Sequence, residues 1–124
     1  MSNEAKQLQE VVIHMEGDIH FKYECCVDST IRKFILYGMY EALHNIRNNI
    51  DSQMCYDDYY IDDVITNTYW LCSNEKMICI EEIYNNIYHF DDNREEIRRI
   101  YGKLEAYDDI ENYIASWLNW CIEE

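Results

Sequence analysis

The absence of proline is the feature that most limits how this chain can be organised. The 124 residues contain no proline and three glycines. Proline and glycine most often mark the turns and linkers that separate structural units. Because neither accumulates anywhere, the sequence shows no domain boundary, and a chain of this length is within the usual size of one domain. We therefore predict a single compact domain over residues 1–124.

The balance of apolar and charged residues predicts a chain that folds. Apolar residues make up 48% of the sequence and aromatic residues 15%, which is more core-forming material than a disordered acidic segment contains. No basic stretch followed by an apolar run is present near the N-terminus. The longest apolar run, residues 34–40, is far too short to span a membrane. We expect a cytoplasmic protein, in a bacterium or in a host cell.

The cysteines indicate a reducing compartment. The chain has six, two of them adjacent: Cys25, Cys26, Cys55, Cys72, Cys79 and Cys121. In a small secreted protein this number would suggest a disulfide framework. Here there is no secretion signal and no glycosylation sequon, and several cysteines lie within apolar patterns, where a thiol behaves as a small apolar group. We therefore predict reduced thiols.

The first 50 residues predict a hairpin followed by a helix. Residues 11–27 alternate with a period of two, with Glu16-Gly17-Asp18 between the two runs, which favours an antiparallel β-hairpin with one buried face. Asp28-Ser29-Thr30 can cap a helix. Apolar residues then recur every three or four positions, which predicts a long amphipathic helix ending near Ile50.

The middle of the chain allows two interpretations. Residues 65–72 and 77–80 are rich in β-forming side chains around the turn-like residues 73–76, which favours a second hairpin. The apolar spacing in this region also suits two helices, marked by Ile61, Val64, Ile65 and Thr68 and by Ile80, Ile83, Tyr84 and Ile87.

The last third of the sequence predicts two helices. Ile97, Ile100, Tyr101 and Leu104 mark the first, and Ile110, Tyr113, Ile114, Trp117, Leu118 and Cys121 mark the second. Asp108 and Glu111 have the spacing of a capping box at the start of the second helix. The predicted fold is therefore α+β, with an N-terminal hairpin, a long helix, a second hairpin and two C-terminal helices. The alternative is a mostly α bundle with one hairpin.

Negative charge is concentrated in the second part of the chain. Residues 1–50 hold seven acids and five bases, whereas residues 51–124 hold eighteen acids and five bases. Between residues 51 and 92, ten carboxylates accompany a single base, Lys76. Few of these acids have an opposite charge three or four residues away, so they repel one another and destabilise the compact state. Such a cost suggests a functional use.

The acid spacing suggests imitation of a nucleic-acid backbone. Acids four apart on a helix lie about 6 Å apart along its axis, and alternate strand residues about 6.6 Å apart, comparable to successive phosphates. Nearby tyrosines could anchor an interface, because they bury a large area and keep a polar tip. The predicted partner-binding residues are Tyr56, Asp57, Asp58, Tyr59, Tyr60, Asp62, Asp63, Glu81, Glu82, Asp91 and Asp92.

Signatures of catalysis are missing from the sequence. It has no Gly-rich phosphate loop, no Cys-x-x-Cys pair, no nucleophile elbow and no His-Glu-x-x-His. We therefore predict a protein that is not an enzyme, with no catalytic residues, no metal and no cofactor. The leading hypothesis is an inhibitor that blocks the basic channel of a nucleic-acid-handling protein, such as a nuclease, CRISPR or restriction machinery, or a nuclease toxin. It would bind the protein and not nucleic acid itself.

In size and charge the chain is similar to phage anti-restriction and anti-CRISPR proteins and to bacterial immunity proteins against nuclease toxins. No motif carries this similarity, so it implies no site residues. The alternative hypothesis is a viral or cellular adaptor that binds a partner protein through an apolar or aromatic surface near Tyr113, Trp117 and Trp120, with the charge serving solubility.

Overall fold

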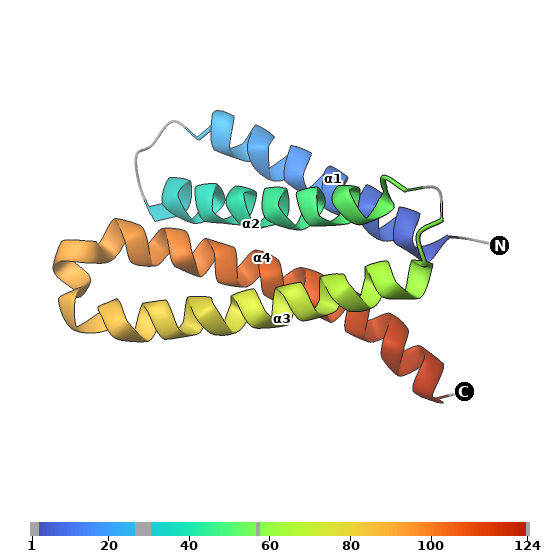
Figure 1. The fold of residues 1–124 in the computed structure, drawn as a ribbon. Helices are drawn as coiled ribbons and strands as arrows, with labels where there is room; N and C mark the ends of the chain where they lie inside the picture. The colour runs from blue at the N-terminus through green and yellow to red at the C-terminus, as the bar shows by residue number, and fades with distance from the viewer. Residues whose placement is uncertain (1–2, 27–30, 57, 124) are drawn as a thin grey trace.

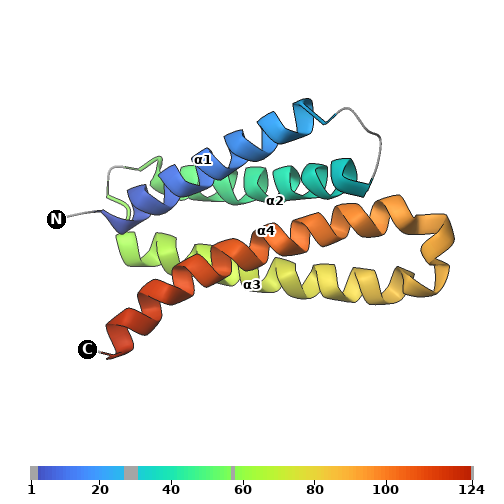
Figure 2. The same ribbon diagram turned by 180° about the vertical axis from the view of Figure 1, so that it is seen from behind.

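Four helices form the fold (Figure 1). The computed structural model describes residues 3–26, 31–56 and 58–123. The helices are α1 (Glu4–Glu24), α2 (Ile31–Met54), α3 (Ile61–Asn86) and α4 (Phe90–Glu123), with a short 3-10 helix, η1 (Ile87–His89), before α4. Successive helices run in opposite directions, and both ends of the chain lie at one end of the bundle (Figures 1 and 2).

The order of the helices in space places α3 at an edge. α4 packs between α2 and α3, and α1 packs on the other side of α2. α3 makes only minor contacts with α1 and α2, so α4 provides most of its support. One side of α3 is therefore turned away from the bundle. None of the described helices is both long and apolar enough to cross a membrane.

The predicted N-terminal hairpin is wrong, because residues 11–24 belong to α1. The buried positions of α1 are spaced three and four residues apart, which is a helical and not a strand repeat: Ala5, Leu8, Val12, Glu16 and Ile19. Ile13 and Phe21, both on the predicted buried strand face, are 44% and 66% exposed. The side chain of Asn3 accepts a hydrogen bond from the backbone N–H of Lys6 and caps the helix.

The long helix predicted after the first hairpin is present as α2, and it continues one turn beyond Ile50 to Met54. The capping residues predicted for its start, Asp28-Ser29-Thr30, lie outside the described residues. Two glycines let α2 and α4 approach closely. A Cβ atom at Gly38 would overlap the backbone carbonyl of Arg99, and one at Gly102 would overlap that of Ile35.

The second predicted hairpin is also wrong, because residues 65–83 lie within the continuous helix α3. Val64, Thr68, Cys72 and Cys79 follow a helical repeat and are buried. The hydroxyl of Thr68 donates to the backbone carbonyl of Val64 at 2.7 Å, which satisfies this polar group inside the core. The alternative of two helices in this region is wrong as well, and so is the single hairpin of the predicted mostly α bundle. The described part of the chain contains no strand.

The two predicted C-terminal helices are one helix, α4, with a non-helical residue at Asn93. Asp108 and Glu111 do not form a capping box. They lie in the middle of α4, where the Nζ atom of Lys76 is 3.0 Å from Asp108 Oδ1 and 3.1 Å from Glu111 Oε2. Lys76, which the sequence suggested was part of a turn, instead joins α3 to α4 by ion pairs.

The core combines side chains from all four helices. Its largest fully buried side chain is Tyr107, whose hydroxyl accepts a hydrogen bond of 2.9 Å from Asn45 Nδ2. Burial raises the pKa of this phenol. Glu16 is also buried, and its carboxylate lies 3.0 Å from His44 Nδ1 and 3.1 Å from Arg47 Nη1. Both contacts join α1 to α2, so the buried charge is paired.

The cysteines should differ sharply in reactivity. Cys25 and Cys55 are exposed, whereas Cys72 and Cys79 are buried. Burial raises the pKa of Cys72 to about 12, so its thiol stays protonated at pH 8, and only the thiolate is a strong nucleophile. We expect Ellman's reagent at pH 8 to modify Cys25 and Cys55 quickly, and Cys72 and Cys79 only after denaturant is added. Peptide mapping by mass spectrometry would locate the modified thiols, and fast modification of native Cys72 would contradict this burial.

Candidate interaction surface

The first group of predicted acids lies where the chain enters α3. Asp58 precedes the helix, and Asp62 and Asp63 are in its first turn. The positive end of the helix dipole stabilises carboxylates at these positions. Glu4 of α1 borders the same shallow depression as Asp62 and Asp63. Asp57 lies outside the described residues. The structure therefore brings two of the predicted acids, Asp62 and Asp63, together with Glu4, which sequence reasoning missed.

The predicted tyrosines beside this group have different roles. Tyr56 and Tyr60 are exposed and available to a partner. Tyr59 is partly buried against the core, and its hydroxyl accepts a hydrogen bond of 2.9 Å from Asn3 Nδ2. Tyr59 therefore attaches the segment before α3 to the start of α1, which is a structural role.

The second group of predicted acids lies at the other end of α3. Glu81 and Glu82 are in the C-terminal half of that helix, and Asp91 and Asp92 are in the first turn of α4. Nineteen residues of helix separate Asp62 from Glu81, which corresponds to about 28 Å. The predicted acids thus form two groups and not one continuous surface.

Most of these acids have no neutralising partner. Asp91 lies 3.8 Å from Arg94, in an ion pair on the protein surface. Among the described residues, no ion pair involves Asp58, Asp62, Asp63, Glu81, Glu82 or Asp92. Lys76 is the only base in α3, and it is bound to Asp108 and Glu111 of α4. Both ends of α3 therefore carry uncompensated negative charge.

Large apolar side chains occupy the outer side of α3, from Trp70 past Glu81 to the end of the helix. Trp70 and Met77 each precede a buried cysteine by two residues, which places them about 200° around the helix from the core. Trp70, Met77 and Tyr84 follow one another at seven-residue intervals and are 56%, 62% and 66% exposed. We call the outer α3 stripe the set that these three form with two further exposed residues, Ile80 of α3 and Ile87, the first residue of η1.

An exposed stripe of this kind is unusual. Single exposed apolar residues are common on protein surfaces, but a contiguous set with polar surroundings marks a site of interaction. Asp63 and Glu81 lie on the same side of α3 as Trp70, because eighteen residues make five complete turns. The outer face of α3 therefore presents Asp63 before the stripe and Glu81 beside it.

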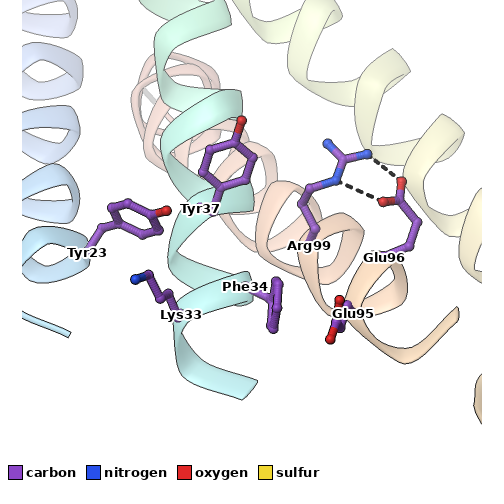
Figure 3. Close-up of a pocket in the computed structure, with 7 residues that line it drawn as sticks. All are labelled: Tyr23, Lys33, Phe34, Tyr37, Glu95, Glu96 and Arg99. Carbon is purple, nitrogen blue, oxygen red and sulfur yellow. Dashed lines mark hydrogen bonds and ion pairs between the residues drawn. The ribbon is translucent and has the colours of Figure 1, made fainter. Parts of the chain in front are cut away.

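A cavity of about 450 Å³ lies between α1, α2 and the start of α4 (Figure 3). It is lined by Tyr23, Lys33, Phe34, Tyr37, Glu95, Glu96 and Arg99. The guanidinium of Arg99 binds Glu96 on its own helix and Glu41 of α2, the latter at 2.8 Å. These hydrogen bonds raise the pKa of Arg99 and lower that of Glu96. The ion pair with Glu41 therefore joins α4 to α2, and the two carboxylates leave Arg99 with little capacity to bind a ligand.

The surface that the adaptor hypothesis placed near the C-terminus is less available. Tyr113 and Trp117 pack edge to face with ring centres 4.7 Å apart, and both lie against the core. The side chain of Trp120 lies outside the described residues. Within the described part of α4, these aromatic residues stabilise the fold and present less apolar area than the outer α3 stripe does.

Protein-family models, curated proteins and solved structures contain no match to this chain. Function must therefore be inferred from the surface itself. Sequence reasoning missed the outer α3 stripe because it favoured strands for Trp70, Met77 and Ile80. The seven-residue spacing of Trp70, Met77 and Tyr84 was the signal that could have revealed it.

Proposed function

We propose that this protein is a non-catalytic binding module that engages a basic partner protein through the outer α3 stripe and the acids beside it. The observation that carries the proposal is the exposure of five large apolar side chains along one side of an edge helix. Trp70 and Tyr84 belong to the residue types that most often dominate binding energy at protein interfaces. Burying each large side chain of the stripe would contribute about 1.5–3 kcal/mol before the entropic cost of association.

The acids give this interface a preference for positive charge. Asp62 and Asp63 at one end and Glu81 at the other are solvent-exposed, and none of them forms an ion pair with a residue that the structure describes. Such charges accelerate encounter with a basic surface and disfavour acidic proteins, although each contributes little to affinity at physiological salt. Basic nucleic-acid-binding proteins are one class of partner with a matching surface charge.

Imitation of a nucleic-acid backbone stays a prediction. It needs closely spaced negative charge along a continuous path, whereas the two acid groups are about 28 Å apart with apolar side chains between them. A partner surface built for phosphates would meet Trp70 and Met77 in the middle of that path. The geometry therefore favours a protein surface with its own apolar strip.

The proposal is tested by capture from cell extract with three immobilised variants. Trp70→Gln/Met77→Gln/Tyr84→Gln removes the stripe, Asp58→Asn/Asp62→Asn/Asp63→Asn removes charge, and Ile13→Gln/Phe21→Gln changes exposed apolar residues of α1 as a matched control. We expect a basic protein to be retained saturably by the wild type and the α1 control, and about tenfold less by the stripe variant. The charge variant should retain less of this protein than the wild type does, and the difference should be largest at low salt.

Quantitative mass spectrometry of the retained proteins measures each outcome, and circular dichroism checks that every variant folds. Substitutions of exposed residues usually change stability little, so all three variants should remain folded. If the charge variant lost the partner completely while the stripe variant kept it, backbone mimicry would replace the present proposal.

A further inference from the structure

We infer that the outer α3 stripe is one half of a two-helix seam, whose other half is a basic amphipathic helix of a partner protein. The inference rests on the proposed function and specifies the chemistry of the partner. Three features of α3 support it: the spacing of the stripe, the charge around it, and a backbone whose groups are already hydrogen-bonded within the helix.

The spacing of the stripe matches the repeat of paired helices. Trp70, Met77 and Tyr84 alternate with Ser73, Ile80 and Ile87 at intervals of three and four residues. This is the a and d pattern of a heptad, in which side chains of one helix insert between those of another. The seam runs from residue 70 to residue 87, about 26 Å, and contains one polar position, Ser73.

The state of the backbone excludes an extended peptide as partner. A peptide that binds as a strand needs a sheet edge with unpaired N–H and C=O groups. The N–H groups of residues 70–86, and the C=O groups up to the last turn, are used within the continuous helix α3, so recognition there must come from side chains. An amphipathic helix laid along the stripe meets this requirement.

The charge around the stripe identifies the partner as basic. Asp62 and Asp63 precede the stripe, Glu81 lies beside it, and Asp92 follows it at the start of α4. The single base of α3, Lys76, is engaged by α4 and cannot serve the interface. A partner helix with lysine or arginine beside its apolar positions would neutralise these acids, as charges beside a heptad seam commonly do.

The same charges exclude a second copy of this chain. Two α3 helices packed against each other would place carboxylates opposite carboxylates in either relative orientation, with no free base on α3 to offset them. The net charge of −15 adds repulsion between the whole molecules. Apolar burial along one helix would have to overcome the repulsion between the facing carboxylates and the repulsion between the whole molecules. A basic helix would instead be attracted by the carboxylates and by the net charge.

The test uses the full chain and three labelled synthetic peptides of about 21 residues, or three heptads. The first carries leucine at the a and d positions and lysine or arginine beside them. The second has the same composition with the leucines at irregular spacing, and the third replaces the basic residues with glutamate. Fluorescence anisotropy measures binding to the wild type, to Trp70→Gln/Met77→Gln/Tyr84→Gln and to the α1 control Ile13→Gln/Phe21→Gln.

We expect the first peptide to bind the wild type and the α1 control alike, and the stripe variant about tenfold or more weakly. The irregular peptide should bind about tenfold more weakly than the first, and the acidic peptide should not bind. Equal binding of the regular and irregular basic peptides would overturn the inference, because charge alone would then explain recognition. A wild-type dimer in sedimentation velocity that the stripe variant cannot form would also overturn it, by assigning the stripe to a second copy.

Failure of this inference is separable from failure of the proposed function. If no peptide binds but the stripe variant loses its captured protein, the partner is not a simple helix and the proposed function stands. If the stripe variant retains every captured protein and no peptide binds, both are overturned.

Discussion

Alanine at Gly38 or at Gly102 is expected to destabilise the protein by about 2–3 kcal/mol, although alanine is the better helix former by about 1 kcal/mol. A Cβ at Gly38 would overlap the backbone carbonyl oxygen of Arg99, and one at Gly102 would overlap that of Ile35. A backbone atom cannot rotate away as a side chain can. α2 and α4 would therefore have to separate, and the apolar contacts around their crossing would loosen.

Gly17 provides the matched control for this prediction. It lies within α1, and a Cβ there would meet nothing within 4 Å. Gly17→Ala should therefore stabilise the protein by about 0.5–1 kcal/mol through helix propensity alone. Urea unfolding followed by circular dichroism measures all the variants. Gly38→Ala/Gly102→Ala should cost less than the two single changes together, because either one already separates the helices. A stable Gly38→Ala variant would show that the two helices do not approach so closely.

Replacing Lys76 with methionine is expected to destabilise the protein by about 2 kcal/mol, because it leaves the mostly buried carboxylate of Glu111 without a partner. The Lys76 ammonium lies 3.0 Å from Asp108 Oδ1 and 3.1 Å from Glu111 Oε2, and the side chain of Glu111 is 15% exposed. Methionine keeps most of the apolar stem that packs between α3 and α4. The loss therefore reports the charge and not the volume.

The pH dependence of this contribution follows from its partners. The hydrogen bond to Asp108, and then the ion pair with Glu111, raise the pKa of Lys76 above its unfolded value of about 10.4. Its stabilising effect is therefore fully present below pH 10 and is lost only as the pH rises through the higher folded pKa.

Two variants check the assignment of Lys76. Lys22→Met removes an ion pair to Asp18 that is about half exposed at both ends, so unfolding by urea should show little change. Lys76→Met/Glu111→Gln should recover much of the lost stability, because it removes the buried charge together with its partner. If the double variant were as unstable as Lys76→Met, the loss would come from packing and not from Glu111.

The sequence contained the helical pattern of α1, but a competing pattern obscured it. Leu8, Val12 and Ile19 follow a three- and four-residue repeat, while Ile13, Phe21 and other residues of α1 also alternate with a period of two. Both patterns consist of apolar residues, and the neighbouring sequence does not discriminate between a helix and a strand. Packing against α2 decides, because it buries Leu8 and Val12 and leaves Phe21 exposed. The error over α3 has a different cause, because β-forming side chains around the turn-like residues 73–76 favoured strands although the buried residues follow a helical repeat.

The candidate site was also predicted only in part from the sequence. Charge alone identified Asp62, Asp63 and Glu81, but sequence distance did not show that five turns of helix bring Asp63 and Glu81 to one side of α3. It also assigned Lys76 to a turn, although this residue neutralises two acids of α4. The apolar residues Trp70 and Met77 were assigned to a second hairpin, so the side of α3 on which they lie was not predicted.

The sequence by itself determined a strongly acidic second part and enough apolar surface for a core. It also determined the long helix α2, where only one repeat is consistent with the apolar residues. What only the tertiary structure decided is which of the many apolar residues of α1 and α3 are buried. Each helix can turn only one side to its neighbours, and α3 lies at the edge of the bundle. Part of its apolar surface is therefore left for another molecule.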